Sequence, residues 1–258
     1  MELIKSVRKR GLLSSVLHIL FNLVYVAVVL MLVRIFDAPW AAMTLTVISK
    51  WRVFAVRPRY WLVNALSNLT DFLFGLGIVA LMWVVGDAMA IQIGLSVMYA
   101  AWLILLKPMH RHIWVVLQAG ISQFVAISAL FVVAHLIPLP IVVLFCFAIG
   151  FASVRHVFSS HSEEQATLLA MVWGLIVAEL GFVAYHWTIG YPIIGSLEIP
   201  QIAIIVTALA FVVERSYSSY IHHEKVRWQD VQWPIIFATV LIGMLLFFFS
   251  GLGSAAQL

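Results

Sequence analysis

The sequence predicts an all-α, polytopic membrane protein: a bundle of about nine transmembrane helices with its N-terminus in the cytosol. Of the 258 residues, 64% are hydrophobic and 10% are charged, whereas a soluble domain is about half apolar and a quarter charged. The apolar residues form unbroken runs of roughly 20, which suit membrane helices and exceed the ~10-residue strands of a β-barrel. Lys and Arg lie in alternate gaps between these runs, as the positive-inside rule requires.

The first two segments decide the topology. A basic stretch precedes the first run, which is long enough to span and ends in Arg34 without a small-residue cleavage site, so we expect an uncleaved helix. The second segment is the weakest, because it crosses only if Lys50 and Arg52 belong to the helix and extend to the interface. Otherwise it is re-entrant and the count is eight. The nine segments are expected at 11–33, 38–56, 61–85, 88–106, 113–134, 138–154, 165–187, 198–214 and 233–251.

Charge favours nine spans. If all segments cross, every Lys and Arg except Arg34 faces the cytosol. If the second does not cross, the four N-terminal basic residues lie opposite all eleven others. The outer connections are short, the longer cytosolic ones run through Arg155–Glu164 and Arg215–Gln232, and no extramembrane loop is large enough to fold alone. We therefore expect one integral membrane domain, 1–258, in a plasma membrane, by default a prokaryotic inner membrane, because the chain has no glycosylation-bearing loop of useful size and no organelle-targeting segment.

Two carboxylates lie deep inside predicted spans, Asp71 and Glu179. Ionisable groups at this depth are costly and are functional candidates by default. Asn64, Asn68 and Asp71 share one helix face with Ser67, and this polar stripe either lines a hydrated path or hydrogen-bonds to neighbouring helices. Glu179 has apolar neighbours and is either a neutral structural group or a proton carrier.

Other helices offer further polar groups. If the first, third, fifth and seventh helices converge, their polar residues would form a pocket open to the cytosol. The predicted substrate or ion path consists of Asp71, Glu179, Asn68, Asn64, His18, Asn22 and Gln118.

A collar of arginines is expected at the cytosolic rim, and it either binds anionic lipid head groups or only sets the topology. Its predicted lipid-contacting members are Arg52, Arg57, Arg59, Arg111 and Arg155. The net charge of +4 has the same topological origin, so we expect no nucleic-acid partner. The expected partners are membrane lipids, together with a second copy or another subunit of a membrane complex.

No motif indicates catalysis, a cofactor or a metal. The chain lacks HExxH, GxSxG and Walker A sequences, the rim histidines lack ligand spacing, and Cys146 is the only cysteine. The leading hypothesis is a small-solute or ion transporter that uses its intramembrane carboxylates, and a non-enzyme is favoured. The alternatives are a membrane-embedded enzyme or binding protein for lipid-linked or anionic lipid substrates, and a structural or assembly subunit.

Overall fold

The computed structural model describes residues 2–36, 38–53, 55–109, 111–161, 163–187, 189–194 and 197–248. The side chains of residues 2–13, Arg52, Leu62 and Phe248 lie outside this description. The predicted lipid contact of the Arg52 side chain and the end of the last predicted segment, 233–251, therefore fall outside the described part of the chain.

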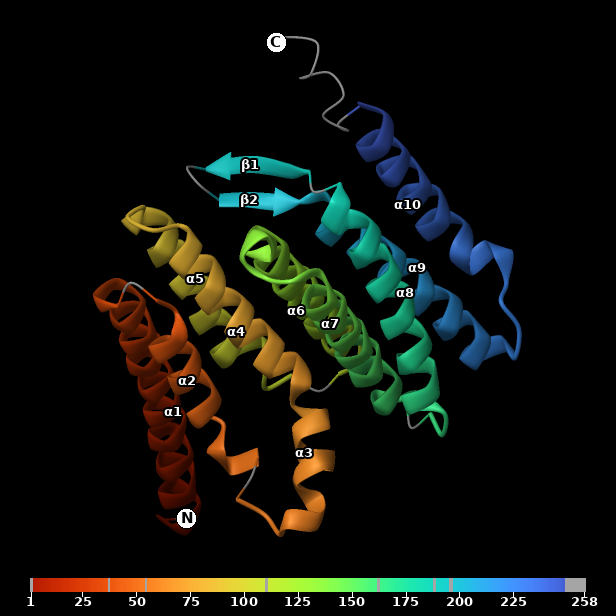
Figure 1. The fold of residues 1–258 in the computed structure, drawn as a ribbon. Coiled ribbons are helices and arrows are strands. Elements are labelled where there is room, and N and C mark those ends of the chain that lie inside the picture. The colour runs from red at the N-terminus through yellow and green to blue at the C-terminus, as the bar shows by residue number, and fades with distance from the viewer. Residues whose placement is uncertain are drawn as a thin grey trace.

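Within the described residues, the fold is a bundle of helices with one small hairpin (Figure 1), which confirms the predicted all-α class. The helices are α1 (Glu2–Ile35), α2 (Trp40–Ile48), α3 (Trp61–Ser67), α4 (Leu69–Val84), α5 (Met89–Ala101), α6 (His112–Val132), α7 (Leu139–Ser160), α8 (Ala166–His186), α9 (Gln201–His223) and α10 (Trp228–Phe248). Short turns η1 (Trp51–Val53), η2 (Pro58–Tyr60) and η4 (Ala134–Leu136) are 3-10 helices, and η3 (Trp102–Leu106) is a π-helix. The hairpin strands are β1 (Gly190–Ile194) and β2 (Leu197–Pro200).

Seven of the described helices are long and apolar enough to cross a membrane, or eight if the bent pair Pro58–Ser67 and Leu69–Val84 counts as one span. This indicates a multi-pass membrane protein. The predicted count of nine is not confirmed, because α2 has nine residues, about half the length that a membrane helix needs.

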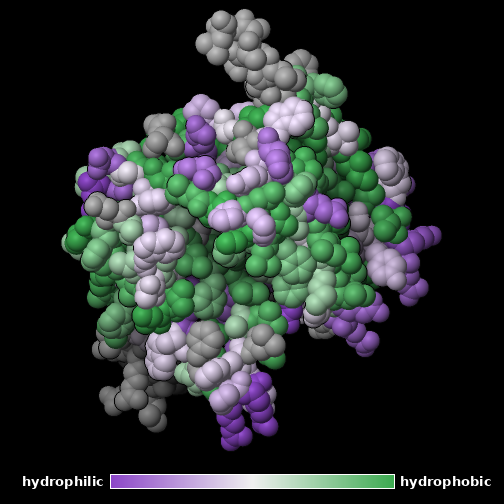
Figure 2. Space-filling model, viewed as in Figure 1, coloured by the Kyte–Doolittle hydropathy of each residue, from purple (hydrophilic) through white to green (hydrophobic). Residues whose placement is uncertain are grey.

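Figure 1 shows α1 beginning at one end of the bundle and α10 ending at the other, beside β1 and β2. We call the first the N-terminal end and the second the hairpin end. The residues from Trp40 to Tyr60 return the chain from the hairpin end to the N-terminal end, through α2 and the irregular turns after it. Hydrophobic side chains cover the middle of the visible face, and most hydrophilic ones lie toward the two ends (Figure 2).

The interior has two adjoining apolar clusters. One is built mainly from α1, α4 and α5, and the other from α6, α7, α8 and α9. Helix α6 joins them, since it packs on α4 and also on α7 and α9. This order keeps α4 and α8 apart, with α7 packed against both.

The predicted third span is bent. Helices α3 and α4 meet at an angle of 62°. The side chains of Ser67 and Asn68 both donate to the carbonyl of Asn64, at 2.9 and 2.8 Å, and such local bonds compete with regular helix geometry. The expected single face from Asn64 to Asp71 is therefore interrupted at Asn68.

The hairpin was not expected, and it shortens the eighth predicted span at its start. Pro200 ends β2 and precedes α9, so the helix begins at Gln201 rather than at 198. The Gln201 side chain donates to the Tyr191 hydroxyl at 3.0 Å and to the Leu245 carbonyl at 2.8 Å. One amide thus ties the hairpin to the end of α10.

Candidate functional site

Asp71 lies in the first turn of α4 and is 6% exposed. Its Oδ2 accepts a hydrogen bond from Lys107 Nζ at 2.6 Å and forms an ion pair with Lys50 Nζ. Its Oδ1 accepts from Trp102 Nε1 at 3.1 Å. Both carboxylate oxygens therefore have partners, and we call Asp71, Lys50, Lys107 and Trp102 the lysine–aspartate cluster.

The end of α2 and the π turn η3 position the partners of Asp71. Lys50 follows the end of α2, is 7% exposed, and donates also to the Asp71 main-chain carbonyl at 3.2 Å. Trp102 and Lys107 belong to the π turn, in which the Lys107 amide donates to the Trp102 carbonyl at 2.9 Å. That wide turn lets two residues five positions apart reach the same carboxylate, and single π turns are frequent at functional sites.

Gln118 holds the connection after the π turn. Its Nε2 donates to the carbonyls of Leu106 and Met109, at 2.5 and 3.0 Å, and its Oε1 lies 3.1 Å from His156 Nε2. Gln118 was predicted to line a path, but the structure uses its amide to fix the segment that carries Lys107.

A hydroxyl network lies beside the cluster. The Tyr25 and Tyr99 hydroxyls are 3.0 Å apart, and Tyr25 donates to Thr46 Oγ1 at 3.2 Å. Gly75 permits this packing, because a Cβ there would come within 2.8 Å of the Tyr99 hydroxyl. The network connects α1, α2 and α5 across α4, so the polar groups in this half of the bundle bond to one another.

The lysine–aspartate cluster joins helices. Removing one partner of a buried ion pair typically costs about 3–5 kcal/mol, so the cluster fixes α2 and the π turn against α4. Lys107 keeps contact with the surroundings, since its side chain is 44% exposed.

Three of the predicted path residues, Glu179, His18 and Asn22, do not gather around Asp71, whereas the Asn68 carbonyl accepts a hydrogen bond from the Asp71 amide at 3.1 Å. Glu179 lies exposed on α8 and makes no hydrogen bond or ion pair with any residue that the structure describes. His18 is exposed on α1, and Asn22 donates to its carbonyl at 2.9 Å. His18 lines a shallow hollow with Ser14, Ser15, Ile19 and Ile104. The expected common pocket is therefore not formed, because α4 and α8 lie on different sides of α7.

The arginines of the predicted collar are spread over the N-terminal end. Arg57, Arg59 and Arg111 are exposed, and the Arg59 guanidinium lies 4.6 Å from the Tyr60 ring centroid. Arg155 is half-buried, and its Nε has no hydrogen-bond partner within the described ranges. Their binding of lipid head groups stays a prediction.

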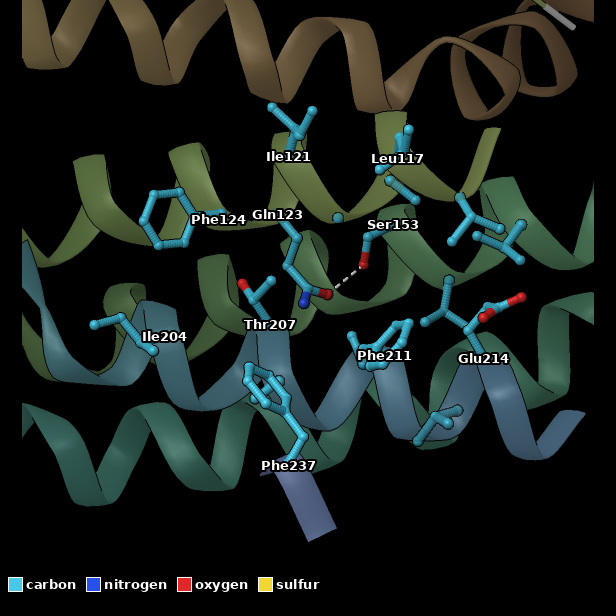
Figure 3. A pocket seen from close by; sticks show the side chains of 18 of the residues that line it. Leu117, Ile121, Gln123, Phe124, Ser153, Ile204, Thr207, Phe211, Glu214 and Phe237 are labelled. Carbon is cyan, nitrogen blue, oxygen red and sulfur yellow. Dashed lines mark hydrogen bonds between the residues drawn. The ribbon is translucent and has the colours of Figure 1, made fainter. Parts of the chain in front are cut away.

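An apolar cavity, which the sequence analysis missed, lies between α6, α7, α9 and α10 (Figure 3). Its volume is about 390 Å³, within the ~300–1,000 Å³ range of ligand pockets. Its wall is formed mainly by large apolar side chains, among them Leu117, Ile121, Phe124, Ile204, Phe211 and Phe237. The cavity exists because small residues on α6 and α9 line it and leave the space between the helices unfilled. These residues are Gly120, Ala208 and Ala210.

Few polar groups enter the cavity. Gln123 is fully buried, and its Oε1 accepts from Ser153 Oγ at 2.5 Å (Figure 3). The same oxygen accepts from Trp173 Nε1 at 3.1 Å. The hydroxyl of Thr207 donates to the Ala203 carbonyl at 2.7 Å. The middle of the cavity is thus polar at a few points, and these groups already have protein partners.

Glu214 marks the end of the cavity that is nearest the N-terminal end. Its carboxylate is 11% exposed and is held loosely, 3.4 Å from His112 Nε2 and 3.5 Å from Arg215 Nε. The cavity follows α9 from Ile204 to Glu214, a length of about 15 Å at 1.5 Å per residue. It is therefore an elongated apolar slot with one charged end.

Aromatic and titratable groups pack just beyond this charged end. The rings of His112 and His161 are 4.2 Å apart, and the Tyr217 hydroxyl donates to Glu163 Oε2 at 2.5 Å. Burial, followed by the neighbouring His112, lowers the pKa of His161. The bond from Tyr217 lowers the pKa of Glu163. Within the described residues, no group of His, Cys, Asp and Glu could hold a metal ion.

No protein-family model, no curated protein and no solved structure matches the chain. Its function therefore has to be argued from the geometry of these two sites.

Proposed function

We propose that the protein binds a lipid-type molecule within the membrane and that the apolar chain of this ligand occupies the slot between α6, α7, α9 and α10. The observation that supports this proposal is the cavity itself, which is large enough for a ligand and almost entirely apolar. Three side chains at its rim, Leu117, Phe211 and Phe237, are also exposed on the surface of the bundle. The slot therefore opens sideways toward the surrounding lipid.

The shape of the slot favours an amphipathic ligand. A chain lying along α9 would have its polar group beside Glu214, His112 and Arg215. Arg111 directly precedes α6 and is the chain neighbour of His112, so an anionic head group would find basic partners there. The proposal keeps the lipid-binding alternative suggested by the sequence but moves its site from the predicted arginine collar to the slot.

Transport coupled to both carboxylates has less support. Asp71 is fully partnered within the lysine–aspartate cluster, and Glu179 lies outside the bundle interior. A transport path that uses both Asp71 and Glu179 would need a cavity that both carboxylates line. We propose instead that Asp71 serves to hold helices together.

We propose the topology that the charge pattern favours, with nine passes and a cytosolic N-terminus in a plasma membrane. Two observations support it: within the described residues, Arg57, Arg59 and Arg111 lie in connections at the N-terminal end whereas Arg34 lies at the hairpin end, and the segment from Trp40 to Tyr60 returns the chain alongside α1 (Figure 1). Lys50 would then lie within the membrane, neutralised by Asp71 rather than extended to the interface.

Filling the slot tests the binding proposal. In Gly120→Leu the new side chain enters the cavity without a clash, because a Cβ there has no heavy atom within 4 Å. Gly94→Leu is the matched control, since Gly94 is exposed on α5 and is equally free of neighbours.

Bound lipid is then measured by mass spectrometry after stringent detergent exchange. We expect about one retained lipid per chain in the wild type and in Gly94→Leu, and at least a fivefold loss in Gly120→Leu. Equal retention in all three proteins would show that the slot does not hold the lipid.

A further inference from the structure

Glu179 is exposed near the middle of α8 and makes no hydrogen bond or ion pair with the described residues of its own chain. It lies about 20 Å along α8 from the start of that helix at Ala166 and about 10 Å from its end. Its large neighbours Leu175, Phe182 and Val183 are each at least half exposed. A carboxyl group is thus presented toward lipid, at a depth where lipid provides no hydrogen-bond partner.

Helix α8 cannot turn to bury this carboxyl. Its opposite face carries Gly174 and Gly181, which pack tightly on α7: a Cβ at Gly174 would lie 2.9 Å from the Phe147 carbonyl oxygen, and one at Gly181 would overlap the Cys146 sulfur. These glycines set the rotation of α8, so the outward direction of Glu179 is built into the bundle.

The outward face of α8 has the pattern of a helix-pairing seam. Positions along it alternate in steps of four and three, which is the heptad spacing of left-handed helix pairs. All of its members are exposed: Leu168, Val172, Leu175, Glu179, Phe182 and His186. A single polar residue in such a seam fixes register and oligomeric state.

We propose that this seam packs against the same seam of a second copy of the chain and that the two Glu179 carboxyls meet at the two-fold axis. Two copies in one membrane share their orientation, and a two-fold contact brings identical residues together at identical depth. A protonated carboxyl both donates and accepts a hydrogen bond, so the two groups satisfy each other when at least one is protonated. Arg34, a basic residue at the hairpin end, donates a hydrogen bond from Nη1 to Gln92 Oε1 at 2.7 Å. It already has a partner within its own chain, so the pairing of the two Glu179 carboxyls does not need it.

Cysteine cross-linking in native membranes tests the seam directly. Cys146 is buried, so a Cys146→Ala background removes the only native thiol with little change at the surface. Leu175→Cys lies on the seam, Ile176→Cys lies one position around the helix, and Val97→Cys is exposed on α5. We expect oxidation to give a cross-linked dimer with Leu175→Cys, and at least a fivefold weaker band with the other two. Equal bands at the three positions, or none with Leu175→Cys, would overturn the proposal.

Substitution of Glu179 tests its role in the pair. Subunits in vesicles are counted by single-molecule photobleaching. Glu179→Gln should keep the dimer, because an amide also donates and accepts, and Glu179→Lys should raise the dissociation constant at least tenfold, because two ammonium groups repel. A dimer of unchanged affinity in Glu179→Lys would contradict the assignment. The cross-linking result does not depend on whether that variant folds.

Discussion

Loss of the Asp71 charge should destabilise the bundle more than loss of either lysine. In Asp71→Asn the buried Lys50 ammonium, 7% exposed, keeps the main-chain carbonyl of residue 71 and the Phe72 ring, 5.4 Å from Nζ, but loses its counter-charge. An uncompensated charge of this kind costs about 3–5 kcal/mol. Lys107→Met should cost about 1 kcal/mol or less, because that side chain is 44% exposed and exposed pairs contribute little.

Lys50→Met falls between these two variants. Asp71 then keeps Lys107 and Trp102 as partners, so the loss should be about 1.5–3 kcal/mol, the range for a hydrogen bond to a charged group. The double variant Lys50→Met/Asp71→Asn leaves no buried charge and should recover most of the loss seen in Asp71→Asn.

The single thiol provides the assay. Cys146 is 1% exposed, so a thiol-reactive fluorophore reports unfolding in detergent as temperature or denaturant rises. The ranking Asp71→Asn, Lys50→Met, Lys107→Met, from largest to smallest loss, supports the account. A double variant less stable than Asp71→Asn, or a Lys107→Met loss equal to that of Asp71→Asn, would refute the argument that Lys50 is the charge that needs neutralising.

Two further outcomes follow from the geometry. Gly181→Ala should reduce stability by about 1–3 kcal/mol through overpacking against Cys146, and adding Cys146→Ala should restore part of it, measured by loss of helical circular dichroism on heating; no recovery would place the strain elsewhere. The pKa of His161 is lowered in the folded protein, so its neutral form is favoured, and stability should be full above its ordinary pKa and fall as the pH drops through that range. His161→Gln should reduce the change in melting temperature between pH 7 and pH 5. If the melting temperature changes with pH as much as in the wild type, other groups cause the pH dependence.

Composition and run length were sufficient to predict the helical membrane class, since the apolar runs coincide with membrane-length helices for most of the chain. Composition and run length did not predict the backbone conformation where it depends on a side-chain hydrogen bond or on a residue distant in the sequence. Asn68 bends the third segment through a bond to Asn64, and the π turn at Trp102 has no periodic signature. Neither feature changes the mean hydropathy of its segment.

The candidate site was predicted in part. Asp71 was correctly singled out as a buried ionisable group, but its partners were not, because Lys50 and Lys107 are 21 and 36 positions away. A useful signal was present: a lysine in the weakest span and a carboxylate inside the next one are a natural buried pair. The apolar slot gave no comparable signal, since it arises from small residues of separate helices that only the packing brings together.

A density map of the purified protein in a lipid nanodisc would show whether the slot between α6, α7, α9 and α10 holds a lipid chain. A bound lipid should give continuous elongated density from Ile204 to Glu214, with its wider end beside His112 and Arg215. A slot closed by inward movement of Phe211 and Phe237, with no density between the helices, would contradict the binding proposal.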